Sequence, residues 1–455
     1  MAVLKRINKT IVTNLLNTSI PTIIAFLLSD VFTIVDTILI GAIKNESIYA
    51  ASLSAINISA RVLLFISAIS RGINVSSSTI LSRYLATNDK EKIQSTLIHT
   101  IILNVFVISL PLVIICLIFA KPIILFIGND PMIYEVGKGY YIAIIIGFSF
   151  SSFNNIMAFL TRAVGESKTT LKLETFANIF NIIGDIVLIN GLWIFPKLNV
   201  TGAGIATLIY KIILFFLYIK LLLKSNSKLK IDFKYKFKYD PQMIKNLLKI
   251  GLPGSTELLS IRGANIIFTK IIAYLGTTVL AAQQICMTIF NFLVEIGNAL
   301  SVSVAPLVSK CIGEEKPKTA RLYIKYSCLL SLIISTIVGL ILVIFFQPIL
   351  NLYTDSENIK LIVNTVLLVM ILAQYVQNIR DVYAGGLRGI GDTKYIAKYT
   401  ILADVILKLI LAYMCIYILN LNLLSVWIVT LLIELFKAFA LSIKFNYRKW
   451  ENIKL

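Results

Sequence analysis

Apolar residues run through this chain in long stretches, and polar residues gather between them. Twelve stretches have the roughly 20 predominantly apolar residues that an α-helix needs to cross a hydrocarbon core. They centre near residues 28, 64, 108, 150, 182, 212, 260, 293, 333, 371, 408 and 433. The pattern predicts an all-α membrane protein with twelve transmembrane helices.

Composition agrees with an apolar environment. Of the 455 residues, 58% are hydrophobic and 15% are charged, and the mean hydropathy is +0.86. Typical soluble domains carry about 25% charged residues, so this balance argues against ordinary soluble folding. The first apolar run is too long for a cleavable signal peptide and lacks a small-residue cleavage site, so we expect it to remain as a span.

Basic residues alternate from one loop to the next. One set of loops includes the N-terminal segment from Lys5 to Lys9, the run KSNSKLKIDFKYKFKYD at 224–240 and the C-terminal segment from Lys444 to Lys454. The positive-inside rule then places both termini and the central loop in the cytoplasm, in a cell-membrane protein. This placement accounts for the net charge of +20, so we expect no nucleic-acid partner. Binding of anionic lipid heads is an alternative role for the central run.

Several chemistries have no support in the sequence. The five cysteines are scattered without a CxxC pair, and His99 is the single histidine. Neither a zinc site nor a histidine-based triad is therefore indicated. The chain also has no GxxxxGK[ST] loop to cradle ATP. We expect a protein without a cofactor that is not an enzyme.

An internal repeat organises the chain. RAVGESK at 162–168 recurs as RGIGDTK at 388–394, and LSRYLA at 81–86 matches VSKCIG at 308–313. LNVTGAGIAT at 198–207 matches LNLLSVWIVT at 421–430. Transporters are commonly built from such repeats. We expect two six-helix lobes in parallel orientation, with boundaries at 1–224, 225–245 for a basic linker, and 246–455.

These motifs resemble the MATE family of multidrug and toxic compound extrusion transporters, and most closely its DinF-like bacterial branch. The resemblance lies in Pro21 followed by VDT at 35–37, in the two heptads, in FPKLNVTGAGIAT at 195–207, and in LPGSTELL at 252–259 followed by LGTTVLAAQQI at 275–285. It implies two lobes forming a V around a central cavity, and exchange of H+ or Na+ for mostly cationic organic compounds. Drugs and lipids are the expected partners of a protein that we expect to be a monomer.

Asp36 is the central candidate residue. It lies within FTIVDTILIG at 32–41, and an acid at the centre of a span costs about 2.5 to 3.5 kcal/mol on insertion scales. Such a group normally faces a protein interior or a water-filled cavity, where pairing with a neighbouring arginine is the structural alternative. The resemblance places Asp36 on the residue that carries the coupling ion in DinF-like members.

The fifth span supplies partners for Asp36. Asn181 and Asp185 are four residues apart, so they lie on one helical face. Two carboxylates in an apolar pocket repel until a proton or one hard cation relieves the repulsion. The resemblance adds Thr207 and makes Asp36, Asn181, Asp185 and Thr207 the H+ or Na+ site. A hydroxyl such as that of Thr207 often bonds back to its own helix instead.

Other polar residues in the first half are weaker candidates. Asn154 or Asn155 is expected to support the site, and Asn178 to support it or to pack between helices. Asp30 points away from the face of Asp36. It either lines the cavity or, as we slightly favour, pairs with Arg61 or Arg71 of the second span.

The second half carries its own charges. Glu257 is the best candidate there for substrate contact, and a salt bridge is expected between Asp404 and Lys408 because of their spacing. Residues near Ile261 and Gln377 stand where NorM-like members have acids, which argues against a second-half Na+ site. The roles of several charges stay open; they are Arg71, Arg262, Arg380, Glu295, Asp381 and Asp404.

The expected function is efflux by alternating access, with a hinge at Pro21 because proline removes a helical hydrogen bond. Two alternatives remain. A flippase for lipid-linked saccharides would use Arg71, Arg262 and Arg380 on a diphosphate. An intramembrane enzyme would use Asp36 and Asp185 as an acid pair, although the repeat and the missing metal ligands weigh against it.

Overall fold

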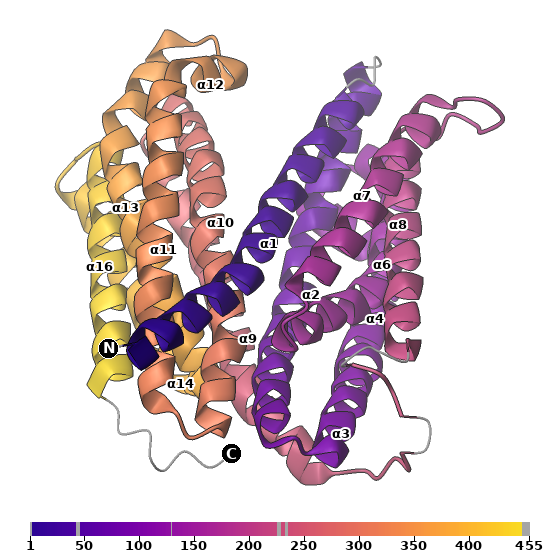
Figure 1. The fold of residues 1–455 in the computed structure, drawn as a ribbon. Coiled ribbons are helices and arrows are strands. Elements are labelled where there is room, and N and C mark those ends of the chain that lie inside the picture. Colours follow the sequence, from indigo (N-terminus) through magenta and orange to yellow (C-terminus); the bar gives the residue numbers. More distant parts are fainter. Residues whose placement is uncertain (1, 42–45, 129, 225–228, 233–234, 448–455) are drawn as a thin grey trace. The chain divides into compact units, whose positions relative to one another are not determined.

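The computed structural model describes residues 2–41, 46–128, 130–224, 229–232 and 235–447, and these form helices joined by short turns (Figure 1). No strand occurs in these residues. The chain groups into two compact units. We call Ile24–Leu252 the first lobe, and Met1–Ile23 together with Pro253–Leu455 the second lobe.

The first lobe contains most of the N-terminal helices. After α1 (Ala2–Gly41), the order is α2 (Glu46–Thr87), α3 (Lys90–Ile101), the π-helix η1 (Ile102–Ser109), α4 (Leu110–Ile118), α5 (Ala120–Gly128), α6 (Pro131–Ala163), α7 (Ser167–Asn190) and α8 (Asn199–Leu223). Two of these helices begin at aspartates whose side chains accept backbone N–H bonds. Asp89 caps α3, and Asp130 caps α6 ahead of Pro131 at its first position.

The second lobe follows the same plan. Its helices are α9 (Pro241–Ala273), α10 (Thr277–Gly313), α11 (Pro317–Ile344), α12 (Phe346–Tyr353), α13 (Glu357–Ile390), α14 (Thr393–Ile401), η2 (Leu402–Leu407), α15 (Lys408–Tyr413), η3 (Met414–Ile418) and α16 (Leu423–Tyr447). Packing partners correspond between the lobes: α2 packs on α6 as α10 packs on α13, and α6 packs on α8 as α13 packs on α16.

The predicted all-α membrane architecture is confirmed, and a continuous helical run covers each of the twelve predicted centres. Eleven of these runs in the described chain are long and apolar enough to cross a membrane by composition alone. The twelfth is α9, which has the length of a span but carries Glu257, Arg262 and Lys270.

The turns of the internal repeat have matching backbone conformations. Gly165 and Gly391, at the same place in the two heptads, have φ of +84° and +91°. Asn88 and Glu315, in the turns after the second pair of motifs, have φ of +53° and +55°. Each turn follows a predicted cytoplasmic helix end. The repeated motifs therefore end their helices in the same way, with one residue at positive φ.

The lobe boundaries differ from the predicted ones because α1 and α9 each run through from one lobe to the other. The boundary in α1 falls after Ile23, two residues beyond Pro21, and the boundary in α9 falls at Pro253. The end of the basic segment belongs to the first lobe, where Leu229 is fully buried. There the Asp240 backbone N–H donates to His99 Nε2 at 2.9 Å.

Substitution of Gly165 tests the repeated turn. No atom lies within 4 Å of a Cβ built on Gly165, so Gly165→Ala adds no clash and strains only the backbone. We expect a loss of about 1 to 2 kcal/mol, seen as a lower melting temperature in detergent. Gly263 in α9 is the matched control, since it also has open space but no positive φ. Equal melting temperatures for Gly165→Ala and Gly263→Ala would contradict this account of the turn.

Candidate functional site

A polar pair lies inside α7 in the first lobe. Asn181 and Asp185 are 3% and 1% exposed, and the Asn181 side-chain amide donates to Asp185 Oδ2 at 3.1 Å. The four-residue spacing stacks the two side chains one turn apart, as the sequence predicts. The pair presents carboxylate and amide oxygens in an apolar helix bundle. Such oxygens can accept a proton or act as ligands to a hard monovalent cation.

Close packing of α7 on α8 brings Thr207 to the same level. A Cβ built on Gly184, next to Asp185, would lie 2.9 Å from Ala206 Cβ, so only glycine permits this approach. Thr207 follows Ala206 and is half-buried. Its counterpart in the repeat, Thr430, bonds back to the Val426 carbonyl at 3.0 Å. No such bond is found for Thr207 among the described residues.

The structure describes the side chain of only one of the two acids of α1. Asp36 lies in the helical part of α1 that belongs to the first lobe, but its side chain lies outside the described residues. Asp30 is half-buried and joins no ion pair with Arg61 or Arg71, all three of which are described. The favoured pairing of Asp30 was therefore wrong. Arg61 and Arg71 are both exposed on α2.

The asparagines of the first lobe separate into distinct roles. The Asn178 amide donates to the Glu174 carbonyl at 2.8 Å, a bond within its own helix. Asn154 is buried and donates to the Lys211 carbonyl at 2.9 Å, whereas Asn155 is exposed. Of the two neighbours, Asn154 is thus the one that ties α6 to α8.

Lys211 is a charged residue that the sequence analysis did not single out. It lies in α8, is 5% exposed, and points toward α6, where a Cβ on Gly147 would be 3.4 Å from its Nζ. The sequence feature that could have revealed it is a single lysine inside the apolar run LIYKIILFF at 208–216.

A metal centre is not assembled in the described part of the chain. Among those residues, no three His, Cys, Asp or Glu side chains gather as a metal site.

A chain of buried ion pairs crosses the second lobe. Arg380 on α13 contacts Asp381 Oδ1 at 2.6 Å and Glu434 Oε2 of α16 at 3.1 Å. Lys437 lies 2.6 Å from Glu434 and 2.8 Å from Asp404 of η2. Acids and bases therefore alternate along three helices. Glu434 and Lys437 were missed, although they stand inside the apolar run LIELFKAFAL.

This network corrects the expected Asp404–Lys408 salt bridge. Asp404 pairs with Lys437 instead, and the Lys408 ammonium lies 4.3 Å from the centre of the Phe268 ring. The π-helical turn at Leu402–Leu407 also replaces the α-helical spacing on which that expectation depended. Arg380, whose role the sequence leaves open, is a member of the network and is not available to a substrate phosphate.

Glu257 is buried in the second lobe, where it contacts Arg388 and Thr400. It is 3% exposed, lies 3.4 Å from Arg388 and accepts from the Thr400 hydroxyl at 3.5 Å. Its burial does not favour the predicted contact with substrate. Glu295 accepts from the Asn298 amide at 3.3 Å on the same helix. Arg262 on α9 is half-buried and forms no ion pair in the described part of the chain.

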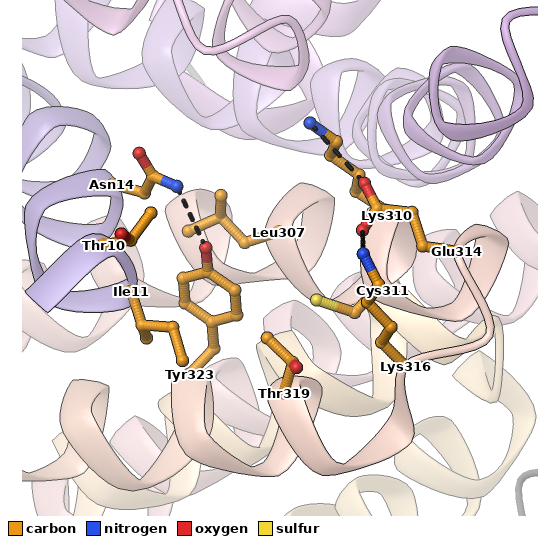
Figure 2. Close-up of a pocket in the computed structure, with 10 residues that line it drawn as sticks. All are labelled: Thr10, Ile11, Asn14, Leu307, Lys310, Cys311, Glu314, Lys316, Thr319 and Tyr323. Carbon is orange, nitrogen blue, oxygen red and sulfur yellow. Dashed lines mark hydrogen bonds and ion pairs between the residues drawn. The ribbon is translucent and has the colours of Figure 1, made fainter. Parts of the chain in front are cut away.

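A cavity of about 520 Å³ lies at the end of the second lobe where α10 turns into α11 (Figure 2). Thr10, Ile11 and Asn14 of α1 form one wall, and the Asn14 amide donates to the Tyr323 hydroxyl at 3.4 Å. Lys316 in the turn bonds Glu314 at 3.0 Å, which raises the pKa of the Lys316 ammonium. The lysines at this cavity are already paired with Glu314, so it is not an open cation or anion site.

Removal of one member tests the ion network. Lys437→Met leaves Asp404 and Glu434 without their shared cation. Breaking a buried pair costs about 3 to 5 kcal/mol, so we expect a large fall in melting temperature, partly restored by adding Asp404→Asn. Lys444→Met is the control, because Lys444 is 36% exposed and 4.0 Å from Asp392. If both single variants melt like the unsubstituted protein, the network does not hold the lobe together.

Comparison with known proteins assigns the fold. The MatE family model matches residues 21–187 and 253–414, two segments that begin at the prolines of α1 and α9. A MOP superfamily transporter from Pyrococcus furiosus has the same fold, with a TM-score of 0.87 at 20% identity, covering 95% of this chain and 94% of that one.

Two relatives carry functional names. A probable multidrug resistance protein NorM from Photorhabdus laumondii is 25% identical over 384 residues, which cover 83% of this chain and 81% of that protein. An FAD transporter from Shewanella oneidensis is 25% identical over 351 residues, which cover 76% of this chain and 75% of that protein. Both likenesses extend over both lobes.

Proposed function

Because the chain belongs to the MATE family of transporters, we propose that it is a multidrug efflux transporter that exchanges organic, mostly cationic and amphipathic compounds for H+ or Na+. The observation that carries the proposal is the buried Asn181–Asp185 pair in the first lobe. A carboxylate that is 1% exposed in a membrane lobe has a large free-energy difference between its charged and neutralised forms. Such a group responds strongly to the arrival of one proton or cation.

The proposed cycle uses charge neutralisation as its switch. With Asp36 and Asp185 both ionised, their repulsion keeps the first lobe open and attractive to a cationic drug. Binding of H+ or Na+ removes that repulsion and favours the state in which drug leaves outward. Asn181 and Thr207 supply further oxygens for the ion. Ion and drug thus compete for one lobe, which is the requirement for exchange.

The hinges are proposed at the two prolines. Pro21 lies two residues before α1 passes from one lobe to the other, and Pro253 lies where α9 does so. Each proline removes a backbone hydrogen bond at that point, so the helix bends there at least cost. Pro253 is thus proposed as a second hinge beside Pro21, the single hinge expected from the sequence.

The driving force and the orientation follow from the membrane. Inward movement of one cation gains about 2.3 kcal/mol per 100 mV of membrane potential. The positive-inside pattern supports cytoplasmic termini in the cell membrane, so the ion enters as drug leaves. We propose that a monomer suffices, with drugs and lipids as its partners.

Neutralising either carboxylate tests the proposal. In proteoliposomes with a proton or Na+ gradient, Asp185→Asn and Asp36→Asn are expected to reduce ethidium export to the level of empty vesicles, because neither can alternate between charged and neutral. Asn178→Ala is the matched control, since among the described residues its amide donates to the Glu174 carbonyl of its own helix. Gradient-driven export by Asp36→Asn or Asp185→Asn at the unsubstituted rate would refute the proposed coupling.

A second candidate is transport of a diphosphate compound. The FAD transporter relative and the half-buried Arg262 favour it, and lipid-linked saccharides share the diphosphate group. The same vesicles loaded with FAD, or with an undecaprenyl diphosphate saccharide, separate the candidates. Export of ethidium without either diphosphate supports the efflux proposal, whereas the reverse pattern supports the alternative.

A further inference from the structure

Each heptad of the internal repeat begins with an arginine that the proposed cycle does not use. Arg162 lies in the last turn of α6, and Arg388 lies in the last turn of α13. Each precedes the glycine of its heptad, Gly165 or Gly391, which has a positive φ just beyond the helix. The two side chains therefore start from equivalent places, at the predicted cytoplasmic helix ends of the two lobes.

Arg162 contacts α1 just beyond its proline. The guanidinium carbon lies 5.4 Å from the centre of the Phe26 ring, and Phe26 follows Pro21 by little more than one helical turn. Arg162 is 5% exposed, and its Nη2 lies 3.4 Å from both carboxylate oxygens of Glu174. Charge-assisted hydrogen bonds of this kind are usually about 2.7–2.9 Å long. The contact with Glu174 is thus long, and the Phe26 ring face supplies a second attraction for the buried cation.

Arg388 reaches the corresponding place in the second lobe. Its Nη2 lies 3.4 Å from Glu257 Oε1, and Glu257 follows Pro253 on α9 by one helical turn. Its Nη1 donates to the Ser301 hydroxyl of α10 at 3.0 Å. Both heptad arginines therefore contact the proline-containing helix of their own lobe in the turn after the proline. The contact is a ring face in one lobe and a carboxylate in the other.

The segments before the prolines are held by the opposite lobes. In α1 the Asn14 amide donates to the Tyr323 hydroxyl at 3.4 Å, a contact within the second lobe. In α9 the Thr96 hydroxyl donates to Met243 Sδ at 3.6 Å, a contact within the first lobe. Each of these two helices is thus attached to one lobe before its proline and to the other lobe after it.

A bend moves a lobe only where the helix beyond the bend is attached to that lobe. An arginine suits this attachment, because its planar guanidinium stacks on a ring and also pairs with a carboxylate. We propose that Arg162 and Arg388 are positioning residues that hold α1 and α9 to their lobes beyond the hinges at Pro21 and Pro253. This inference rests on the proposed function and adds the contacts through which the hinges move the lobes.

The first lobe offers a matched pair of aromatic rings for the test. Phe26→Leu keeps an apolar side chain on α1 but removes the ring face. Phe159→Leu is the control, because the Phe159 ring also lies under Arg162, at 6.0 Å, but belongs to the same helix α6 as the arginine. The readouts are the rate and half-saturating concentration of gradient-driven ethidium export, the melting temperature, and hydrogen–deuterium exchange of the α1 backbone beyond Pro21.

Phe26→Leu is expected to lower the maximal export rate by about threefold to tenfold and to speed exchange beyond Pro21. Ethidium still binds, so its half-saturating concentration is expected to change by less than about twofold. Phe26→Tyr is expected to restore both the rate and the exchange, because it keeps the ring. Phe159→Leu is expected to melt like Phe26→Leu and to export and exchange like the unsubstituted protein. The inference is overturned if Phe159→Leu matches Phe26→Leu in rate and exchange, or if Phe26→Leu changes neither.

The second lobe repeats the test with the ion pair. Glu257→Leu is expected to speed exchange in α9 beyond Pro253, whereas Ser301→Ala, which removes the other partner of the same guanidinium, is not. Where Glu257→Leu does not elute as a folded protein, Glu257→Arg with Arg388→Glu is expected to keep slow exchange. Fast exchange in Ser301→Ala alone would contradict the inference. Exchange requires no substrate, so failure of the unsubstituted protein to export ethidium defeats the proposed function, while exchange still decides the role of the arginines.

Discussion

Charge inside the hydrocarbon region is the constraint on which this structure depends. Insertion of a single ionised side chain costs a few kcal/mol, because no water solvates the charge inside the hydrocarbon region. The two lobes satisfy the constraint differently. The second lobe alternates acids and bases from Asp404 through Lys437, Glu434 and Arg380 to Asp381, so that charge is balanced locally. The first lobe keeps Asp185 beside an amide and buries Lys211 against Gly147.

This difference supports the proposed division of labour, in which the first lobe switches and the second lobe is structural. A locally paired network resists change, because removal of one partner leaves the other uncompensated. In the proposed cycle, Asp185 instead changes its charge when a proton or cation binds, and its neighbours then rearrange. The similar helix plan of the two lobes means that the distinction lies in a few substitutions at equivalent positions, such as Lys211 and Glu434, rather than in the fold.

Much of the fold was predictable from the sequence because a membrane imposes long apolar runs and the repeat marks its own turns. The heptads around Gly165 and Gly391 predicted two equivalent helix ends, and both glycines have positive φ. The lobe boundaries were not predictable, since apolar periodicity does not reveal that α1 changes lobe after Ile23 and α9 at Pro253. The salt-bridge partner of Asp404 was also not predictable from the sequence. Asp404 pairs with Lys437, 33 residues away, rather than with the nearby Lys408.

The central claim is that a coupling proton and a cationic substrate compete for the carboxylates of the first lobe. Its most direct test is the release of protons when ethidium is added to the purified protein in weakly buffered detergent, followed with a pH indicator. The account predicts net proton release on binding, which is absent from Asp185→Asn. Tight ethidium binding by the unsubstituted protein without any proton release, across the pH range in which transport operates, would contradict it.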